Sequence, residues 1–179
     1  LKPIQRTVSL AVQRQYEENP YPRWVNTQVD TDPCSVRDLA ERLSLEVEFD
    51  RIESTPAPTI LVAGCGTGQH AVSCAGRFAN SEVLAIDLSL SSLSYASRQS
   101  ADLGVSNIQF VQADILDVAL LGRQFDVIES SGVLHHMADP MAGWRSLKAC
   151  LKPGGLMKVA LYSEVARTQV VAARQAIEA

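Results

Sequence analysis

Residues 60–70 read ILVAGCGTGQH, an apolar run that leads directly into three glycines. The run predicts a buried strand at Ile60–Ala63, and the composition after the glycines predicts a helix. Glycine has no Cβ and adopts positive φ readily, so Gly64 and Gly66 would let the backbone approach a ligand closely. The dinucleotide pattern G-x-G-x-x-G requires its third glycine at position 69, which is Gln69 here. The stretch predicts a nucleotide-type binding turn of unusual spacing or a tight turn without ligand.

Composition narrows the class of protein. With 179 residues, 46% of them hydrophobic and 20% charged, the chain has apolar material for one globular domain and a small appendage. The net charge of -4 provides no chain-wide positive field, which favours a small molecule or a protein over nucleic acid as partner. No apolar run approaches the ~18 residues of a membrane span, so no membrane association is expected.

The spacing of the cysteines bears on the redox state of the compartment in which the protein works. The four of them form no C-x-x-C pair, so neither a zinc site nor a redox motif is predicted. A reducing cytoplasm fits this usage best. The four are Cys34, Cys65, Cys74 and Cys150.

After a Pro-rich joint, STPAPT (Ser54–Thr59), strand and helix patterns alternate five times. The expected strands are Ile60–Ala63, Glu82–Asp87, Asn107–Asp114, Phe125–Ser130 and Leu156–Ser163. Short apolar strands separated by helices are typical of a parallel sheet covered on both faces. The predicted fold class is therefore α/β, a Rossmann-like, doubly wound, mostly parallel sheet of about five strands. Residues 56–179 would form this domain, and residues 1–55 a small helical N-terminal appendage or lid.

Local signals place several helices. Ser89 is a candidate N-cap for a helix that ends at Gly104, and Asp139 followed by Pro140 is a good helix start. The stretch SVRDLAERLSLEV (Ser35–Val47) is amphipathic. The helix that starts at Asp139 would carry an apolar stripe at helical spacing, made of Met141, Trp144, Leu147 and Leu151.

Ligands of such sheets bind beyond the carboxyl ends of the strands, so the residues that follow each strand are the candidates. Asp87 follows the second strand, where a carboxylate can accept hydrogen bonds from both hydroxyls of an adenosine ribose; the alternative is an acid that favours a helix N-terminus. Asp114 follows the third strand and could accept from an adenine amino group while the backbone of Ile115 meets a ring nitrogen. A solvated loop acid is the alternative for Asp114.

The loop after the fourth strand contains the candidates for reaction chemistry. Its polar side chains are Glu129, Ser130, His135 and His136. One histidine could act as a general base or bind substrate, since imidazole titrates near neutrality; a histidine packed at the entry to a helix is an equally good interpretation. No ligand pattern surrounds the two histidines, so no metal site is expected.

The ordered set of motifs between about Ile60 and Ser163 resembles the class I S-adenosylmethionine-dependent methyltransferases. The matching segments are VAGCGTG (Val62–Gly68), Asp87, QAD (Gln112–Asp114), FDVIESSGVLHHMADP (Phe125–Pro140) and LKPGGLMKVALY (Leu151–Tyr162). The resemblance implies S-adenosylmethionine as cofactor and S-adenosylhomocysteine as product. The cofactor-binding residues that it implies are Gly64, Cys65, Gly66, Gly68, Asp87, Leu88, Asp114, Ile115 and Ser130. Val62 stands where the family often has an acid.

The implied reaction is methyl transfer to an unidentified acceptor by in-line displacement, with His135 as the first candidate for a base. Two alternatives remain. An NAD(P)-dependent oxidoreductase is disfavoured by the glycine spacing and by the absence of a Tyr-x-x-x-Lys pair, because Gln99 follows Tyr95 and Ala166 follows Tyr162 at that spacing. A non-catalytic module that binds S-adenosylmethionine or mediates interactions stays open.

The N-terminal QYEENPYPRW (Gln15–Trp24) resembles a stretch of bacterial proteins that join tetratricopeptide repeats to a methyltransferase domain. Its aromatic residues, Tyr16, Tyr21 and Trp24, would belong to a lid or would anchor the appendage. The chain starts at Leu1 and stops within a helical pattern, so a fragment is expected, with repeats upstream. Five strands of the family's seven would leave a sheet edge exposed, a route to a dimer. Such a fragment is expected to bind cofactor, with turnover an open point.

Overall fold

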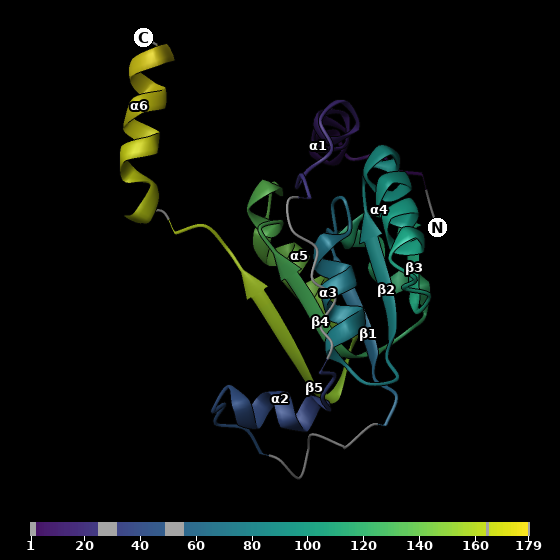
Figure 1. The fold of residues 1–179 in the computed structure, drawn as a ribbon. Coiled ribbons are helices and arrows are strands. Elements are labelled where there is room, and N and C mark those ends of the chain that lie inside the picture. The colour runs from purple at the N-terminus through teal and green to yellow at the C-terminus, as the bar shows by residue number, and fades with distance from the viewer. Residues whose placement is uncertain (1–2, 25–31, 49–55, 164, 179) are drawn as a thin grey trace.

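The computed structural model describes residues 3–24, 32–48, 56–163 and 165–178. Five parallel strands form one sheet in the order β3-β2-β1-β4-β5 (Figure 1). They are β1 (Thr59–Ala63), β2 (Glu82–Asp87), β3 (Ile108–Gln112), β4 (Phe125–Ser131) and β5 (Leu151–Ala160). The strand order reverses between β1 and β4, which creates a crevice at their carboxyl ends. The predicted doubly wound parallel sheet is confirmed.

Both faces of the central strand are buried. Ile60 and Val62 belong to the core shared with α3 (Gln69–Arg77) and with Leu93 of α4 (Leu90–Asp102). The alternate residues of β1 belong to a second core, which α5 (Pro140–Ala149) and the short helix η2 (Ile115–Leu121) cover from the other side. Burial on both faces explains why β1 is uniformly apolar and does not alternate with polar residues.

The predicted helix starts are confirmed by capping contacts. The Ser89 side chain accepts a hydrogen bond from the backbone N–H of Ser92 at the start of α4. Asp139 accepts from two backbone N–H groups of α5, and Pro140 occupies its first turn. The helix ends at Ala149, so Leu151 does not belong to its apolar stripe as predicted: it is the first residue of β5.

Four strands differ from their predicted bounds: β1 starts one residue earlier, β4 ends one residue later, and β3 and β5 differ by more. β5 spans Leu151–Ala160 because Leu151 already pairs with Phe125, and Leu156 pairs with Val127 after a register shift. The intervening Lys-Pro-Gly-Gly segment fits this irregularity, since Pro and Gly are tolerated in strands at bulges. β3 ends at Gln112 because the Asp114 side chain caps the next helix, η2.

The N-terminal helices lie at opposite ends of the sheet (Figure 1). Helix α1 (Thr7–Glu18) lies beyond the carboxyl ends of the strands, and α2 (Val36–Arg42) lies near the other end. A capping box of Ser35 and Asp38 starts α2, as its amphipathic stretch predicts. The boundary predicted at residue 55 falls in 49–55, outside the described residues.

The C-terminal part follows β5, which lies at an edge of the sheet. The helix η4 (Val165–Arg167) and α6 (Thr168–Glu178) come after it, and Figure 1 shows α6 standing away from the sheet. Among the described strands, β4 is the one that pairs with β5, so its other edge is open, and the predicted dimer remains a prediction. None of the described helices has the length and the apolar character needed to cross a bilayer.

Candidate functional site

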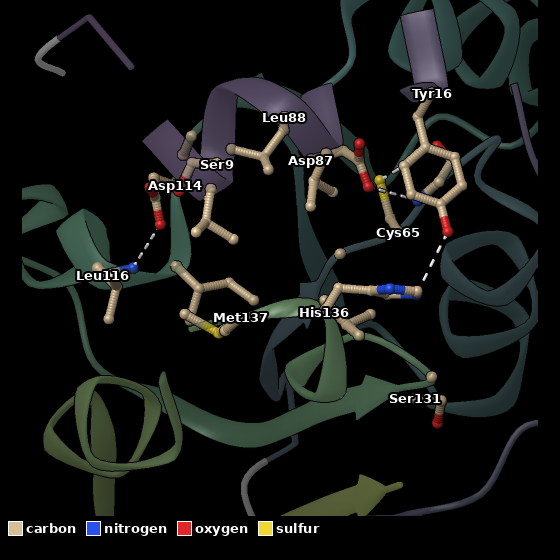
Figure 2. Close-up of a pocket in the computed structure, with 18 of the residues that line it drawn as sticks. Ser9, Tyr16, Cys65, Asp87, Leu88, Asp114, Leu116, Ser131, His136 and Met137 are labelled. Atoms are coloured by element: carbon tan, nitrogen blue, oxygen red, sulfur yellow. Dashed lines mark hydrogen bonds between the residues drawn. The ribbon is translucent and has the colours of Figure 1, made fainter. Parts of the chain in front are cut away.

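A cavity of about 670 Å³ lies between α1 and the carboxyl ends of the central strands (Figure 2). Most of the predicted cofactor-binding residues line it, namely Gly64, Cys65, Gly66, Asp87, Leu88, Asp114 and Ile115. Val62, which stands where the resembled family often has an acid, lines it as well. Gly68 and Ser130 are not among its lining residues. The structure thus brings together the loops after β1, β2 and β3, as predicted.

The glycine turn has a backbone conformation that residues with a side chain rarely adopt. Gly64, Gly66 and Gly68 have φ of 74°, 53° and 90°. A Cβ on Gly66 would clash with the carbonyl oxygen of Tyr21, and one on Gly64 would lie 2.5 Å from the methyl groups of Val133. These glycines therefore allow close approach as well as positive φ.

The third glycine of the turn has a packing role. A Cβ on Gly68 would lie 2.5 Å from the Cβ of Ala96 on α4, and Gly68 is the N-cap of α3. The early glycine therefore allows α3 to start close against α4. Direct contact of Gly68 with a cofactor remains a prediction.

Asp87 lies at the cavity with part of its hydrogen-bonding capacity in use. Its Oδ2 accepts from the N–H of Gly66 at 2.8 Å, and its Oδ1 accepts from the N–H of Ser89 at 3.0 Å. Burial raises the pKa of the Asp87 carboxyl, against the lowering effect of these backbone hydrogen bonds. A carboxylate has about four acceptor positions, so about two remain for a ligand.

Asp114 is nearly saturated by its protein contacts. Its Oδ1 accepts from the N–H of Leu116 at 2.9 Å. Its Oδ2 accepts from the Ser9 hydroxyl at 2.6 Å and from Arg6 Nη1 at 3.1 Å. Arg6 also pairs with Asp117, at 2.6 Å and 2.9 Å. Of about four acceptor positions on Asp114, about one is left.

Helix α1 also binds the loop after β2. Gln13 Nε2 donates to the carbonyl of Leu88 at 3.1 Å, and the Ser89 hydroxyl donates to the carbonyl of Tyr16 at 3.1 Å. The carboxylate of Glu17 accepts from the first two N–H groups of α4, at 2.6 Å and 2.9 Å. No residue of α1 is fully buried. Polar contacts with the loops, more than apolar burial, hold the helix over the cavity.

The three aromatic residues of the N-terminal stretch differ in position: two line the cavity, and the third anchors the stretch to the domain. Tyr16 and Tyr21 line the cavity, as expected of a lid. Trp24 anchors instead: its Nε1 donates to the carbonyl of Thr67 at 3.0 Å, and its ring meets that of Tyr95 edge-on at 5.9 Å.

In the loop after β4, His136 lines the cavity, whereas His135 is not among the lining residues. Tyr16 Oη and His136 Nε2 are 3.3 Å apart (Figure 2), which joins α1 to the short helix η3 (Leu134–His136). His135 lies between the rings of His136 and Tyr162, with centroids 4.2 Å and 4.0 Å away and the ring planes tilted by 47° and 37°. The 3-10 turn decides which histidine faces inward, and no sequence pattern distinguishes two adjacent histidines. The predicted role of His135 as a base remains a prediction.

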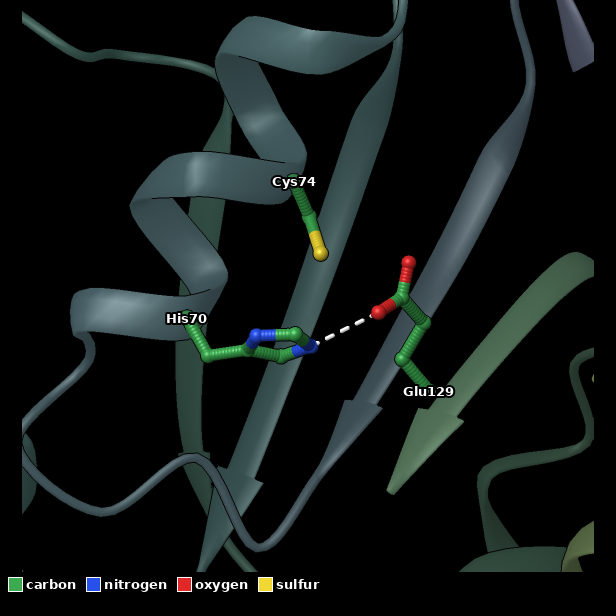
Figure 3. Close-up of side chains that lie close together, drawn as sticks. All are labelled: His70, Cys74 and Glu129. Carbon is green, nitrogen blue, oxygen red and sulfur yellow. Dashed lines mark hydrogen bonds and ion pairs between the residues drawn. The ribbon is translucent and has the colours of Figure 1, made fainter. Parts of the chain in front are cut away.

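The other two polar candidates, Glu129 and Ser130, lie on β4 and are not among the residues that line the cavity. Ser130 is buried and donates to the carbonyl of Ala63 at 3.1 Å, which ties β4 to β1. The Glu129 side chain is 2% exposed and is held by His70 Nε2 at 2.7 Å (Figure 3), Arg77 Nη1 at 2.9 Å and Lys158 Nζ at 3.2 Å. Burial alone would raise the pKa of Glu129, but His70 and the two cations lower it to about 2.

His70, Cys74 and Glu129 have the composition of a metal site, with ligand atoms within 4.8 Å of one another (Figure 3). The chemistry of this donor set does not fit a metal. Two cationic side chains already bind the carboxylate, and burial, with the nearby Glu129 charge, raises the pKa of the Cys74 thiol to about 12. A metal ligand must be deprotonated, so we interpret the cluster as a compensated buried carboxylate.

A parallel sheet with a reversal in strand order, a glycine turn after β1 and carboxylates after β2 and β3 define a Rossmann-like small-molecule-binding domain. Residues 60–155 match the family model described as a methyltransferase domain. That match spans more than half of the 179 residues, and the chain belongs to this family.

Two relatives of the chain have names that indicate different methyl acceptors. The chain is 32% identical over 130 residues to a ubiquinone biosynthesis O-methyltransferase of Cereibacter sphaeroides, covering 70% of this chain and 51% of that protein. It is 33% identical over 121 residues to a tRNA 5-carboxymethoxyuridine methyltransferase of Escherichia coli K12, covering 65% of this chain and 46% of that protein. The chain thus spans about half the length of these relatives.

A solved structure has the same fold. Coclaurine N-methyltransferase bound to N-methylheliamine and SAH superposes with a TM-score of 0.54 at 24% identity, covering 68% of this chain and 35% of that one.

Proposed function

We propose that this chain binds S-adenosylmethionine and transfers its methyl group to an acceptor. The observation that carries the proposal is Asp87: its carboxylate lies at the cavity beside a positive-φ glycine turn, and about two of its acceptor positions are open. Two open positions match the two hydroxyls of a ribose. Membership of the methyltransferase family supports the same chemistry.

The other lining residues fit the remaining parts of this cofactor. The last acceptor position of Asp114 suits one N–H of an adenine amino group, and Leu88 with Ile115 adds apolar surface for the ring. Val62 offers apolar surface but no charge, so we assign recognition of the methionine end to the backbone of the glycine turn at Gly64 and Gly66.

When bound, the cofactor supplies an electrophilic methyl group on a sulfonium. The protein's part is to hold the acceptor in line with that methyl and to exclude water, and positioning of this kind lowers barriers by up to ~7 to 11 kcal/mol. We assign the exclusion of water to α1, which spans the cavity and binds the loops after β2, β3 and β4. In this proposal residues 1–55 contribute a lid, α1, to the domain of residues 56–179.

We also propose a cytoplasmic location. The four cysteines contain no C-x-x-C pair, a usage that fits a reducing compartment. Burial raises the pKa of the Cys65 and Cys150 thiols, which keeps them in the unreactive protonated form. Upstream tetratricopeptide repeats and a bacterial source remain predictions from the sequence resemblance.

Asp87→Ala tests the cofactor site. Removing a charge-assisted pair of hydrogen bonds should cost about 1.5 to 3 kcal/mol, a loss of about ten- to hundredfold in affinity for S-adenosylhomocysteine by calorimetry. Asp102→Ala, an exposed acid at the end of α4, is the matched control and should leave affinity unchanged. Equal affinities for the two variants, or binding of NAD with no binding of S-adenosylhomocysteine, would reject the proposal.

Arg6→Gln combined with Ser9→Ala tests the lid. The double variant removes the contacts of α1 with Asp114, so amide hydrogens of Thr7–Glu18 should exchange several-fold faster. Arg14→Gln changes the same charge on the exposed side of α1 and should leave the exchange unchanged. Identical exchange in both variants would show that these contacts do not hold the lid.

A further inference from the structure

The acceptor end of the cavity contains a pair of polar groups that the cofactor does not need. Tyr16 and His136 both line the cavity, and Tyr16 Oη lies 3.3 Å from His136 Nε2. Figure 2 shows the pair across the cavity from Asp114, with Tyr16 descending from α1. Asp114 marks the adenine side in the proposed function, so the pair belongs to the methyl-accepting side.

Aromatic and apolar groups surround this pair. The Tyr16 and His136 rings meet nearly at right angles, at 77°, with centroids 6.0 Å apart. The row of rings continues through His135 to Tyr162, which lines the cavity and is 55% exposed at its mouth. Other lining side chains near these loops are Tyr21, Pro22, Val133 and Met137. Ring faces and edges of this kind suit a flat acceptor.

The charges of the cavity favour a neutral acceptor. Among the described residues that line it, Arg6 is the one Lys or Arg, and Asp114 and Asp117 both bind it. An anionic acceptor would therefore find, among these residues, no Lys or Arg side chain that is not already bound by a carboxylate. Asp139, the carboxylate nearest in sequence to His136, caps α5 and pairs with Arg145, so it is not poised for an ammonium group.

We propose, resting on the proposed function, that Tyr16 and His136 form an acceptor subsite for a neutral, planar phenol, with His136 as the base. The contact between them is long for a hydrogen bond, so an acceptor hydroxyl can replace Tyr16 on Nε2 while Tyr16 binds the acceptor oxygen. Burial, with the charges of Tyr162 and Asp87, raises the pKa of Tyr16, so its hydroxyl stays neutral.

The proposed step balances as follows. The acceptor oxygen forms a bond to the methyl carbon, and the carbon–sulfur bond breaks with its electron pair going to sulfur. The O–H proton passes to Nε2 of neutral His136, and the imidazolium later releases it to solvent. A phenolic hydroxyl, with a pKa of about 10, is within reach of such a base, whereas an aliphatic hydroxyl with a pKa nearer that of water, about 15.7, is not.

Probes built on one ring system test the substrate class. S-adenosylhomocysteine is titrated first, which tests the proposed function separately. The loaded chain is then titrated with 2-naphthol, 2-naphthoate and 2-(aminomethyl)naphthalene at neutral pH. We expect 2-naphthol to bind at least tenfold more tightly than the anion or the cation. Methyl-labelled S-adenosylmethionine should label 2-naphthol on oxygen and leave 2-naphthalenemethanol unlabelled.

Variants test the two residues. His136→Gln should lower kcat for 2-naphthol at least about hundredfold, the usual contribution of a general base, with affinity for S-adenosylhomocysteine within twofold. Tyr16→Phe keeps the ring and removes the hydroxyl that binds the acceptor oxygen, so it should lower kcat/KM for 2-naphthol about tenfold. His135→Gln separates the two adjacent histidines and should have the smaller effect.

Three outcomes would overturn the inference while the cofactor proposal stands: preference for the charged probes, no binding or labelling of 2-naphthol, or full transfer by His136→Gln. A larger loss in His135→Gln than in His136→Gln would overturn the assignment of the base. Failure of S-adenosylhomocysteine to bind would overturn both proposals together.

Discussion

Glu129→Gln should lower the free energy of unfolding at neutral pH by about 1.5 to 3 kcal/mol, because the buried carboxylate loses its charge-assisted hydrogen bonds. The Glu129 side chain is 2% exposed and faces Arg77 and Lys158 as well as His70. Gln keeps the shape of the side chain but removes its charge. Urea denaturation followed by circular dichroism measures the change.

Glu82→Gln is the matched control for this prediction. Glu82 lies on β2, its side chain is 76% exposed, and its ion pair with Arg123 spans 3.7 Å. Exposed pairs of this kind contribute at most about 1 kcal/mol, so the control should change stability little. Equal losses in the two variants would show that the Glu129 cluster contributes no more than a surface pair.

The same carboxylate sets an acid limit on stability. The pKa of Glu129 is about 2 in the folded chain against an ordinary value of 4.5. Its stabilising contribution is therefore complete above about pH 4.5 and is lost as the pH falls from there toward about 2. Unfolding measured at steps across this window should show a decline that Glu129→Gln lacks.

Gly66→Ala should destabilise the chain by about 2 to 3 kcal/mol and lower its affinity for S-adenosylhomocysteine at least about tenfold. A non-glycine residue at its φ of 53° costs about 1 to 2 kcal/mol. The added Cβ would also clash with the Tyr21 carbonyl, which accepts a hydrogen bond from Thr67 at 3.1 Å. Calorimetry and urea denaturation measure the two effects.

Gly104→Ala separates backbone strain from contact. Gly104 has a φ of 69°, and a Cβ there would meet nothing within 4 Å. This control should lose about 1 kcal/mol of stability and keep its affinity for S-adenosylhomocysteine. If Gly66→Ala behaves like Gly104→Ala, the close approach at the glycine turn has no role in binding.

Features set by short-range signals could be predicted from the sequence. The apolar run of β1, the N-caps at Ser89 and Asp139, and the location of Asp87 after β2 depend on residues close in the chain. The start of β5 at Leu151 was missed because pairing with Phe125 across a bulge overrides the local effect of Pro153.

Features set by docking could not be predicted. Arg6 reaches Asp114 and Tyr16 reaches His136 across more than a hundred residues, and periodicity within α1 does not identify its partners. The same holds for Glu129, whose three partners come from α3 and β5. Which of two neighbouring histidines faces the cavity depended on the 3-10 turn of η3.

The two ends of helix α1 contact opposite ends of the cavity. Arg6, at its N-cap, binds Asp114, and Tyr16, in its last turn, contacts His136. Arg6 and Tyr16 are ten residues apart, which corresponds to about 15 Å along a helix. A rigid helix that contacts both the cofactor end and the acceptor end of the cavity links cofactor binding thermodynamically to acceptor binding. Under the proposed function, the factor by which S-adenosylhomocysteine tightens the acceptor equals the factor by which the acceptor tightens S-adenosylhomocysteine. Loosening the helix at Arg6 should bring that factor toward unity without touching either ligand's own contacts at Asp87 or His136.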